Sequence, residues 1–178
     1  MRVRPATSTD GAVVAALYAP YVLGPGVTFE LVPPGAHAMA GRIATTLLTH
    51  PWLVAERDGV VVGYAYAGLY GTRAAYRWTA ETTIYVGSGQ RGQGVGRVLY
   101  PALLDALRAQ NLRSALARVA MPNPGSARLH TACGFTHFGT HPDAGYKHGV
   151  WHDIAYWSCR LNDTDPPDEP SAYAKPPT

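Results

Sequence analysis

The sequence predicts an α/β domain in which a twisted, mixed β-sheet is flanked by helices. Residues 52–56 and 60–67 are two β-rich runs, and the Asp58-Gly59 pair between them is typical of a tight hairpin turn. Farther along, a strand at 79–86, a glycine-rich loop, a helix at 95–107 and a strand at 114–121 form a β-α-β unit, the usual connection between parallel strands. Antiparallel and parallel pairing in one chain indicates a mixed sheet.

Two helices are expected before this sheet and two elements after it. Ser8-Thr9-Asp10 offers N-cap oxygens to a first helix, whose apolar face is Val13, Val14, Leu17 and Tyr18. A second helix is expected at 36–49, between Pro33-Pro34-Gly35 and Pro51. A short helix at 126–133 and a closing strand at 151–161 complete the domain. Pro101 lies inside the helix at 95–107, where we expect a bend or a lost hydrogen bond.

Length and composition are those of one globular domain. The chain has 178 residues, of which 47% are hydrophobic and 15% charged, so residues 1–161 are expected to form a single domain. From Asn162 onward Asp, Pro, Glu and Ser dominate, which predicts a disordered, Pro-rich tail at 162–178.

Charge and cysteine usage bear on partners and location. The net charge of +3 comes from dispersed Lys and Arg, which favours a phosphate-bearing ligand over a nucleic acid. No apolar stretch approaches the roughly 20 residues needed to cross a bilayer. Only Cys133 and Cys159 occur, and the first residues lack an apolar signal core. We therefore expect a cytoplasmic protein without a membrane span.

The segment 86–97 is the most informative stretch, because its glycines lie between a strand and a helix. Such a loop lets backbone N–H groups converge on phosphate oxygens at the positive end of the helix. Gly87, Gly89 and Gly92 match the spacing of a dinucleotide fingerprint, but the acid about 20 residues on is Asp105, inside the predicted helix rather than at a strand end. A Walker loop would need Gly-Lys-Ser or Gly-Lys-Thr where this chain has Gly96-Arg97-Val98. Both nucleotide-enzyme readings are disfavoured.

The loop Gln90-Arg91-Gly92-Gln93-Gly94-Val95-Gly96 resembles the acetyl-CoA pyrophosphate loop of the GNAT superfamily of N-acetyltransferases. Further segments resemble the phosphinothricin N-acetyltransferase family within it: Pro51-Trp52-Leu53-Val54-Ala55-Glu56, Tyr66-Ala67-Gly68, Trp78-Thr79-Ala80-Glu81, Pro122-Asn123 and Lys147-His148-Gly149. The resemblance covers nearly everything before the tail. It implies the GNAT fold, a homodimer, and transfer of an acetyl group from acetyl-CoA to the primary amine of a small, amino-acid-like molecule.

Two residues are expected to carry the chemistry. Transfer to an amine requires a base for the ammonium and stabilisation of the departing thiolate. The resemblance places the catalytic glutamate at Glu81, acting directly or through a water; mid-strand, beside Trp78 and Ile84, it would be partly desolvated. The alternative is a solvated or salt-bridged carboxylate on an edge strand. His130 stands near the tyrosine that protonates the thiolate in many GNAT enzymes, and its alternative is an ordinary surface histidine.

The resemblance also implies the cofactor and acceptor contacts. Strand residues 84–86 receive the pantetheine arm, the loop binds the pyrophosphate, and polar groups after the next strand complete the site. These cofactor residues are Ile84, Tyr85, Val86, Arg91, Gly92, Gln93, Gly94, Val95, Gly96, Arg97, Asn123 and Ser126. The acceptor residues are Phe29, Arg73, Tyr76 and Lys147, with Arg73 suited to a carboxylate or phosphinate. Asn123 between two prolines is also good turn chemistry.

The chain departs from the herbicide-detoxifying members at three positions. Thr28 and Glu30 stand where those carry an asparagine and an arginine, and Gly71 replaces a lysine. Losing two basic residues and gaining an acid should weaken binding of a doubly anionic acceptor, so methionine sulfone, methionine sulfoximine or another amino acid is a competing acceptor.

Several other functions compete with acetyl transfer to a small amine. His137, His141, His148 and His152 fall close together, but zinc ligands must converge in space, so we expect no metal site. No stacking motif or basic stripe indicates RNA binding. A non-catalytic acyl-CoA-binding sensor would keep the loop but need no base. A protein or peptide amine acetyltransferase would need an open groove at residues 27–30.

Overall fold

The computed structural model describes residues 1–174 and has one seven-stranded mixed sheet with four α-helices. Its strands are ordered β1-β2-β3-β4-β5-β7-β6. The strands are β1 (Arg2–Pro5), β2 (Trp52–Arg57), β3 (Val60–Leu69), β4 (Thr79–Val86), β5 (Ser114–Ala120), β6 (Thr136–Lys147) and β7 (Val150–Arg160). The helices are α1 (Gly11–Leu23), α2 (Ala36–Thr46), α3 (Val95–Ala109) and α4 (Pro124–Ala132), with 3-10 turns η1 (Ser8–Asp10), η2 (Ala74–Tyr76) and η3 (Ser88–Gln90). The predicted mixed sheet is confirmed.

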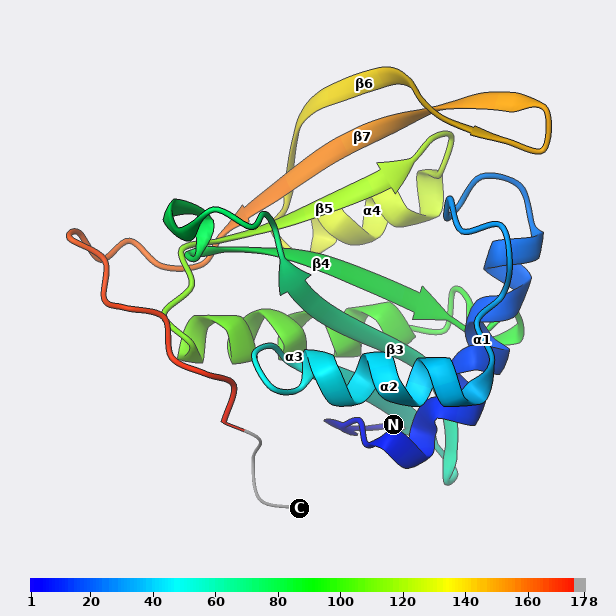
Figure 1. The fold of residues 1–178 in the computed structure, drawn as a ribbon, viewed down its shortest axis with the longest axis horizontal. Coiled ribbons are helices and arrows are strands. Elements are labelled where there is room, and N and C mark those ends of the chain that lie inside the picture. Colours follow the sequence, from blue (N-terminus) through cyan, green and yellow to red (C-terminus); the bar gives the residue numbers. More distant parts are fainter. Residues whose placement is uncertain (175–178) are drawn as a thin grey trace.

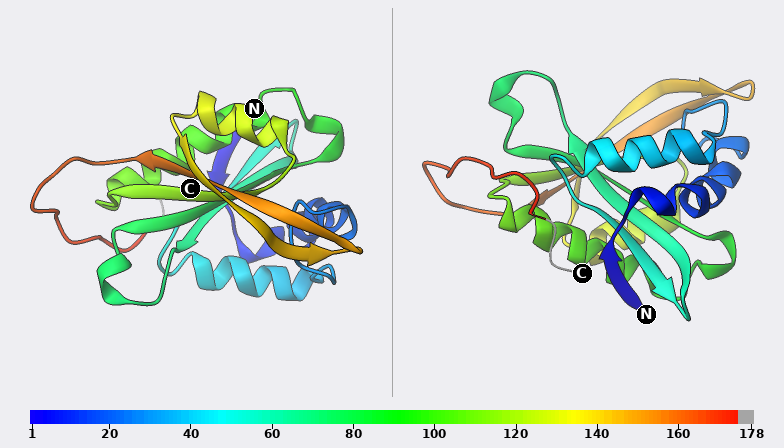
Figure 2. Two further views of the ribbon diagram at one scale, coloured as in Figure 1. Left: turned by 90° about the horizontal axis from the view of Figure 1, so that it is seen from above. Right: turned by 60° about the horizontal axis from the view of Figure 1, so that its bottom comes forward.

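The sheet has a helix layer on each face (Figures 1 and 2). On one face, Leu99, Leu103 and Leu107 of α3 pack in a buried cluster with β-strand side chains such as Ala65 and Ala117. On the other face, α1 and α2 bury Val14, Tyr18, Met39 and Ile43 against Trp52, Val54 and Tyr64. Alternating side chains of one strand therefore enter two different cores, as the period-2 pattern requires.

The predicted hairpin is confirmed at β2 and β3. Asp58 and Gly59 both have positive φ, 51° and 78°, and Arg57 pairs with Val60 across the turn. Two positive φ angles in a two-residue loop match the right-handed twist of the strands that they join.

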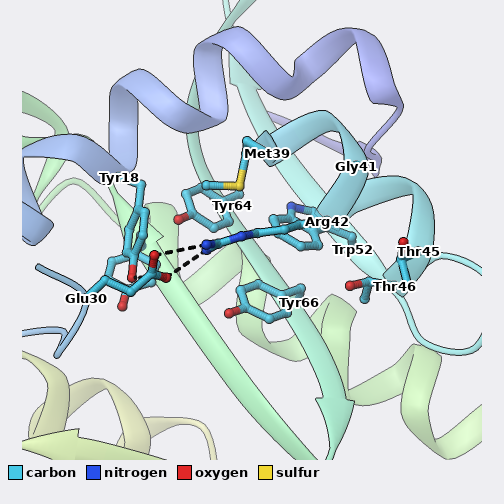
Figure 3. Close-up of a pocket in the computed structure, with 11 residues that line it drawn as sticks. Tyr18, Glu30, Met39, Gly41, Arg42, Thr45, Thr46, Trp52, Tyr64 and Tyr66 are labelled. Carbon is cyan, nitrogen blue, oxygen red and sulfur yellow. Dashed lines mark hydrogen bonds and ion pairs between the residues drawn. The ribbon is translucent and has the colours of Figure 1, made fainter. Parts of the chain in front are cut away.

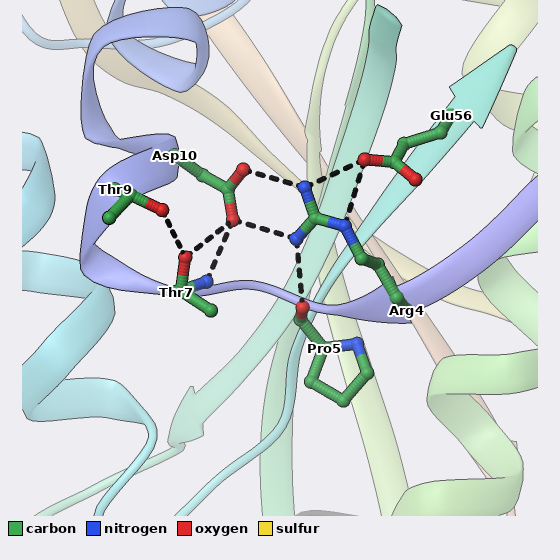
Figure 4. Close-up of polar contacts among 6 residues, drawn as sticks. All are labelled: Arg4, Pro5, Thr7, Thr9, Asp10 and Glu56. Atoms are coloured by element: carbon green, nitrogen blue, oxygen red, sulfur yellow. Dashed lines mark hydrogen bonds and ion pairs between the residues drawn. The ribbon is translucent and has the colours of Figure 1, made fainter. Parts of the chain in front are cut away.

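The edge strands β1 and β6 are absent from the sequence prediction. β1 is four residues long and is tied down by Arg4, whose guanidinium contacts Asp10 at 2.8 Å and Glu56 at 2.9 Å (Figure 4). The Arg4 guanidinium holds the pKa of the Asp10 carboxyl below its usual range. In this way one residue joins β1, β2 and the start of α1.

The disorder predicted for the tail stays a prediction, but the described part of the tail makes contacts. Over residues 162–174 it has no regular secondary structure but lies against the body of the protein. Glu169 pairs with Arg77 at 2.7 Å, the indole N–H of Trp78 donates to Asp168 O at 2.8 Å, and Ser171 N donates to Gln110 O at 3.0 Å. The prediction for 175–178 concerns residues outside the described part. Among the described helices, none has the length and apolar character needed to cross a bilayer.

Candidate active site

The central feature of the site is the separation of β4 from β5. The two strands pair in parallel only at Thr79–Glu81 against Ser114–Leu116. Beyond Glu81, β4 continues to pair with β3 on its other edge, while β5 turns away and pairs with β7 as far as Ala120 (Figure 1). Within residues 1–174, no strand pairs with the β5-facing edge of β4 after Glu81. Ile84, Tyr85 and Val86 lie on this open stretch.

Buried polar side chains hold the two strands at the fork. The Thr82 hydroxyl donates to Leu116 O at 3.1 Å and lies 2.8 Å from the Tyr100 hydroxyl. Tyr100 in turn lies 2.9 Å from His130 Nε2, which links the strands to α3 and α4. This chain of bonds begins where the backbone ladder ends, so it takes over the connection between β4 and the elements beyond it.

Glu81 is the last β4 residue in the ladder. It lies on the face covered by α1 and α2, and its side chain is 22% exposed. Arg118 Nε donates to Glu81 Oε1 at 2.7 Å across the fork. The carboxylate is therefore salt-bridged, but on a central strand rather than on the edge strand that the alternative reading supposed. Sequence analysis missed Arg118, although a charged residue interrupting an otherwise apolar strand was a usable signal.

The glycine-rich loop has the geometry of an anion-binding turn. Gly94 is the N-cap of α3 with φ 81°, and Gly92 has φ 74°, a region that side chains disfavour. No Cβ contact within 4 Å would arise at either position, so their surroundings are open. First-turn amides of α3 have no partner within the helix, which suits a phosphate group. Gly96 differs, since a Cβ there would lie 2.8 Å from Leu129; its role is the close packing of α3 on α4.

Two arginines lie at the loop, one outside it and one within it. Arg57, on the hairpin, donates to the side-chain oxygen of Gln90 at 2.7 Å and to that of Gln93. Arg91 is exposed and its guanidinium lies 4.9 Å from the ring centroid of Tyr21. Arg57 thus organises the predicted loop from outside it, a role that only the hairpin's position relative to α3 reveals.

Asn123 and Ser126 form the cap of α4. Asn123 Oδ1 accepts a hydrogen bond from Ser126 N at 3.0 Å, the standard N-cap interaction. The side-chain oxygen of Asn123 therefore has the local capping role that its place between two prolines predicts. A cofactor contact would use the side-chain NH₂ group. Both residues stay predicted cofactor contacts.

His130 is a core residue, so its reading as a surface histidine is wrong. It is 2% exposed and its ring packs against Tyr100, Phe135 and Trp157. Nδ1 lies 2.7 Å from Ser126 O, which makes this nitrogen the N–H donor. Burial lowers the pKa of the imidazole, so the neutral form dominates at pH 7. Any acid role would have to operate through its hydrogen-bond partners.

Lys147 does not present its charge to an acceptor in this structure. It is 1% exposed, and its ammonium donates to Val22 O at 2.6 Å and Thr28 O at 2.8 Å. Burial lowers its pKa. Its predicted substrate contact is therefore replaced by a different role: it fastens the loop after α1 to the end of β6.

The remaining predicted acceptor residues lie in two loops. Arg73 and Tyr76 are exposed in and beside η2, just before β4; Tyr76 packs edge-on against Tyr70, and a Cβ at Gly71 would lie 2.8 Å from the Tyr76 ring. Phe29 is in the loop held by Lys147, where its ring packs so closely on Gly145 that a side chain there would collide. Arg73 and Tyr76 therefore lie beside the start of β4, a few residues before Glu81, whereas Phe29 lies in the loop after α1.

The histidines singled out in the sequence do not assemble. His137 and His141 are exposed on β6, and His152 packs against Gly26 and Phe29. Within residues 1–174, no group of three or more His, Cys, Asp and Glu side chains is placed to hold a metal ion.

Comparison with known proteins gives a consistent family. The acetyltransferase (GNAT) family model matches residues 32–135. The chain is 41% identical to a phosphinothricin N-acetyltransferase of Streptomyces viridochromogenes, over 88% of this chain and 86% of the relative. It is 32% identical to an L-methionine sulfoximine/L-methionine sulfone acetyltransferase of Salmonella typhimurium, over 94% and 99% of the two chains.

Solved structures agree with the sequence relatives. The crystal structure of a GNAT superfamily phosphinothricin acetyltransferase from Sinorhizobium meliloti, in complex with AcCoA, superposes with a TM-score of 0.88 and 32% identity, covering 98% of this chain and 96% of that one. A second acetyltransferase structure, from Salmonella typhimurium with acetyl-CoA, also has a TM-score of 0.88.

Proposed function

Because this chain belongs to the GNAT family of acetyltransferases, we propose that it transfers an acetyl group from acetyl-CoA to the primary amine of a free, amino-acid-like molecule. The observation that carries the proposal is the fork between β4 and β5, with the ionisable Glu81 at its vertex and the glycine loop at its far end. A pantetheine arm requires an open backbone edge, and a pyrophosphate requires free amides at a helix N-terminus. Both are present on one strand and the loop that follows it.

Glu81 is the proposed base. Acetyl-CoA supplies the activated thioester, and the acceptor must present an uncharged amine to it. Glu81 takes the proton of the acceptor ammonium, directly or through a water. In the structure Arg118 contacts one oxygen of this carboxylate, Oε1, and the other oxygen, Oε2, is the one proposed to receive the proton. Of residues 84–86, Ile84 and Val86 direct their backbone N–H groups to the open edge of β4, where they would polarise the thioester carbonyl.

His130 remains the proposed source of the thiolate's proton. Its Nδ1–H is directed at Ser126 O, and its Nε2 lies beside the Tyr100 hydroxyl. The neutral ring carries no proton on Nε2, so the proposal requires that it first takes up a second proton from water; the Nε2 proton then passes to the Tyr100 oxygen as the Tyr100 hydroxyl proton passes to the thiolate. Tyr100→Phe should then slow turnover about as much as His130→Phe does, whereas a helix-packing role would make the histidine change the more damaging one.

We also infer a homodimer in the cytoplasm. The β6–β7 hairpin exposes large apolar side chains, Phe138, Tyr146, Val150 and Trp151, each more than half exposed, which favours burial against a second copy. Cys133 and Cys159 are both free thiols, as a reducing compartment favours. Sedimentation velocity should give twice the mass of the 178-residue chain, and Trp151→Lys should shift it toward the monomer. A monomer at micromolar concentration contradicts the dimer.

The test of the activity is thiol release from acetyl-CoA with a panel of free amino acids. The panel contains phosphinothricin, methionine sulfone and methionine sulfoximine, with proline as a secondary-amine control. We expect turnover of at least one primary amine and none of proline. Silence across the panel with acetyl-CoA still binding would contradict a free amino-acid acceptor and favour a protein amine or the sensor reading.

A further inference from the structure

A cavity of about 370 Å³ lies between α1, α2 and the sheet, beside the proposed reaction centre. Trp52, Tyr64 and Tyr66 lie on its sheet side and Met39 on its helix side (Figure 3), and Tyr85 also lines it. Trp52 and Tyr66 are stacked with ring centroids 4.2 Å apart. Such a surface favours an apolar or polarisable group over a strongly hydrated one.

The cavity lies over the same face of the sheet as the Glu81 side chain. Every second residue of a strand points to one face. On this face β3 carries Tyr64, Tyr66 and Gly68, and β4 carries Glu81, Thr83 and Tyr85. Tyr66 is opposite Thr83 and Gly68 opposite Glu81, so Tyr66 and Glu81 are diagonal neighbours, about 7–8 Å apart. The cavity therefore begins one residue pair from the proposed base, on the side opposite to Arg73 and Tyr76, which precede β4.

A single ion pair crosses this cavity. Arg42 of α2 reaches between the aromatic side chains to Glu30, with N–O distances of 2.7 and 3.0 Å in a two-pronged contact (Figure 3). The Tyr18 hydroxyl donates to the same carboxylate at 3.0 Å. The Arg42 hydrogen bonds lower the pKa of Glu30, and Glu30 raises that of Arg42. Both groups are thus charged at neutral pH, and their charges cancel.

We propose that this cavity receives the side chain of the acceptor amino acid and that the Glu30–Arg42 pair selects an uncharged, polarisable side chain, such as a sulfone, over an anionic one. The inference rests on the proposed function and names its substrate class. An anionic group such as a phosphinate would approach the Glu30 carboxylate and would have to displace it from Arg42. A cationic group would have to displace Arg42 in the same way. An uncharged side chain stacks on Tyr66 and Trp52 and leaves the pair intact.

Glu30→Gln tests the proposal, because it leaves Arg42 in place without a carboxylate. The quantity measured is the ratio of kcat/KM for phosphinothricin to kcat/KM for methionine sulfone, with acetyl-CoA saturating. We expect the wild type to favour methionine sulfone and the ratio to rise about threefold to fivefold in Glu30→Gln, since the Arg42 guanidinium, whose side chain is 45% exposed, then attracts the phosphinate across partly screening solvent. In Glu30→Gln/Arg42→Gln the gain should disappear.

Asp105→Asn is the matched control, since it removes an exposed carboxylate paired with an arginine at 2.7 Å on α3, in the opposite helix layer. Its ratio should equal that of the wild type, and turnover of methionine sulfone by each variant shows that it is folded. An unchanged ratio in Glu30→Gln, with methionine sulfone still acetylated, overturns the cavity assignment and leaves the proposed function standing. Absence of turnover with every free amino acid in the wild type overturns both.

Discussion

The surroundings of Glu81 depend mostly on residues that are distant in the sequence. Its neighbours in sequence predict a strand and a face, and the family resemblance predicts a base. Its partner Arg118 and its place at the fork depend on where β4 and β5 stop pairing. No local pattern encodes that separation, because it arises from the different pairing demands of β3 and β7.

His130 gives the sharpest residue-scale prediction, through the pH dependence of stability. Burial lowers its pKa in the folded state, whereas the unfolded chain binds a proton near pH 6.5. Acidification from about pH 7 to 5.5 therefore protonates the unfolded state first and lowers the free energy of unfolding. In His130→Gln this part of the pH dependence should be lost. Urea unfolding at several pH values measures it.

Three other titratable groups define the control for that measurement. His50 is also buried with a lowered pKa, so some acid sensitivity should remain in His130→Gln. Asp10 and Glu30 have lowered carboxyl pKa values and lose their stabilising contribution only in more acidic solution, near and below pH 4.5. If the free energy of unfolding changes with pH equally in wild type and variant between pH 7 and 5.5, His130 binds protons alike in the folded and unfolded states.

The contacts of Lys147 and Glu30 are not encoded in local sequence patterns. The family resemblance predicts Lys147 as a substrate contact, but the residue is buried and bonded to backbone carbonyls of α1 and the loop after it. The Glu30–Arg42 pair joins a loop to a helix 12 residues away. Such contacts depend on how a loop folds back, which composition and periodicity do not specify.

The glycine loop supports a prediction at the scale of an element. Gly94 has φ 81° and begins α3. Gly94→Ala should weaken acetyl-CoA binding, because a Cβ strains this backbone by about 1 kcal/mol and approaches the bound phosphate. Gly89→Ala is the matched variant, in the same loop, with ordinary φ and open space around it. Calorimetric titration should give a Kd raised about fivefold or more for Gly94→Ala and nearly unchanged for Gly89→Ala.

The loop between α1 and α2 is tied to the sheet by Lys147. Lys147→Met keeps the length and apolar stem of the side chain but leaves two carbonyls without their donor. We expect a loss of about 1–3 kcal/mol in the free energy of unfolding. The KM of the acceptor should also rise, since the loop carries Phe29 and Glu30. A stable variant with unchanged KM would show that the loop is held by other contacts.

The elements themselves were predicted unevenly. Strand β4 was predicted with its observed bounds and the hairpin with its turn, because alternation and Asp-Gly are strong local signals. Strand β6 was missed, since its Gly139, Pro142 and Gly145 resemble loop residues and the pairing with β7 shifts register twice. An exposed edge strand has no apolar period to reveal it.

At the scale of the molecule, the sheet separates two tasks. The sheet has α3 and α4 on one face and α1 and α2 on the other (Figure 2). The α3–α4 side carries the loop proposed for the cofactor, and the α1–α2 side contains the aromatic cavity and the Glu30–Arg42 pair. Glu81 lies on the cavity side of β4, and the open edge of β4 begins at the next residue. The sheet can thus admit an acetyl donor along β4 while the acceptor approaches from the α1–α2 layer.

The described part of the tail makes contacts that its composition does not indicate. Its composition predicts disorder, yet residues 162–174 bond to Arg77, Trp78, Gln110 and Arg113. These partners lie at the start of β4, the end of α3 and the start of β5, around one end of the sheet. Backbone carbonyls and single polar side chains make most of the contacts, and such contacts leave no hydrophobic pattern in the sequence.

The most direct test of the account is the turnover of wild type and Glu81→Gln with acetyl-CoA and the best acceptor of the panel, with the N-acetylated product identified by mass spectrometry. We predict that kcat falls about 10²–10⁴-fold in Glu81→Gln, the usual contribution of a general base, while the Kd of acetyl-CoA stays unchanged. An undiminished kcat in a folded variant would contradict the central claim that Glu81 accepts the proton of the amine.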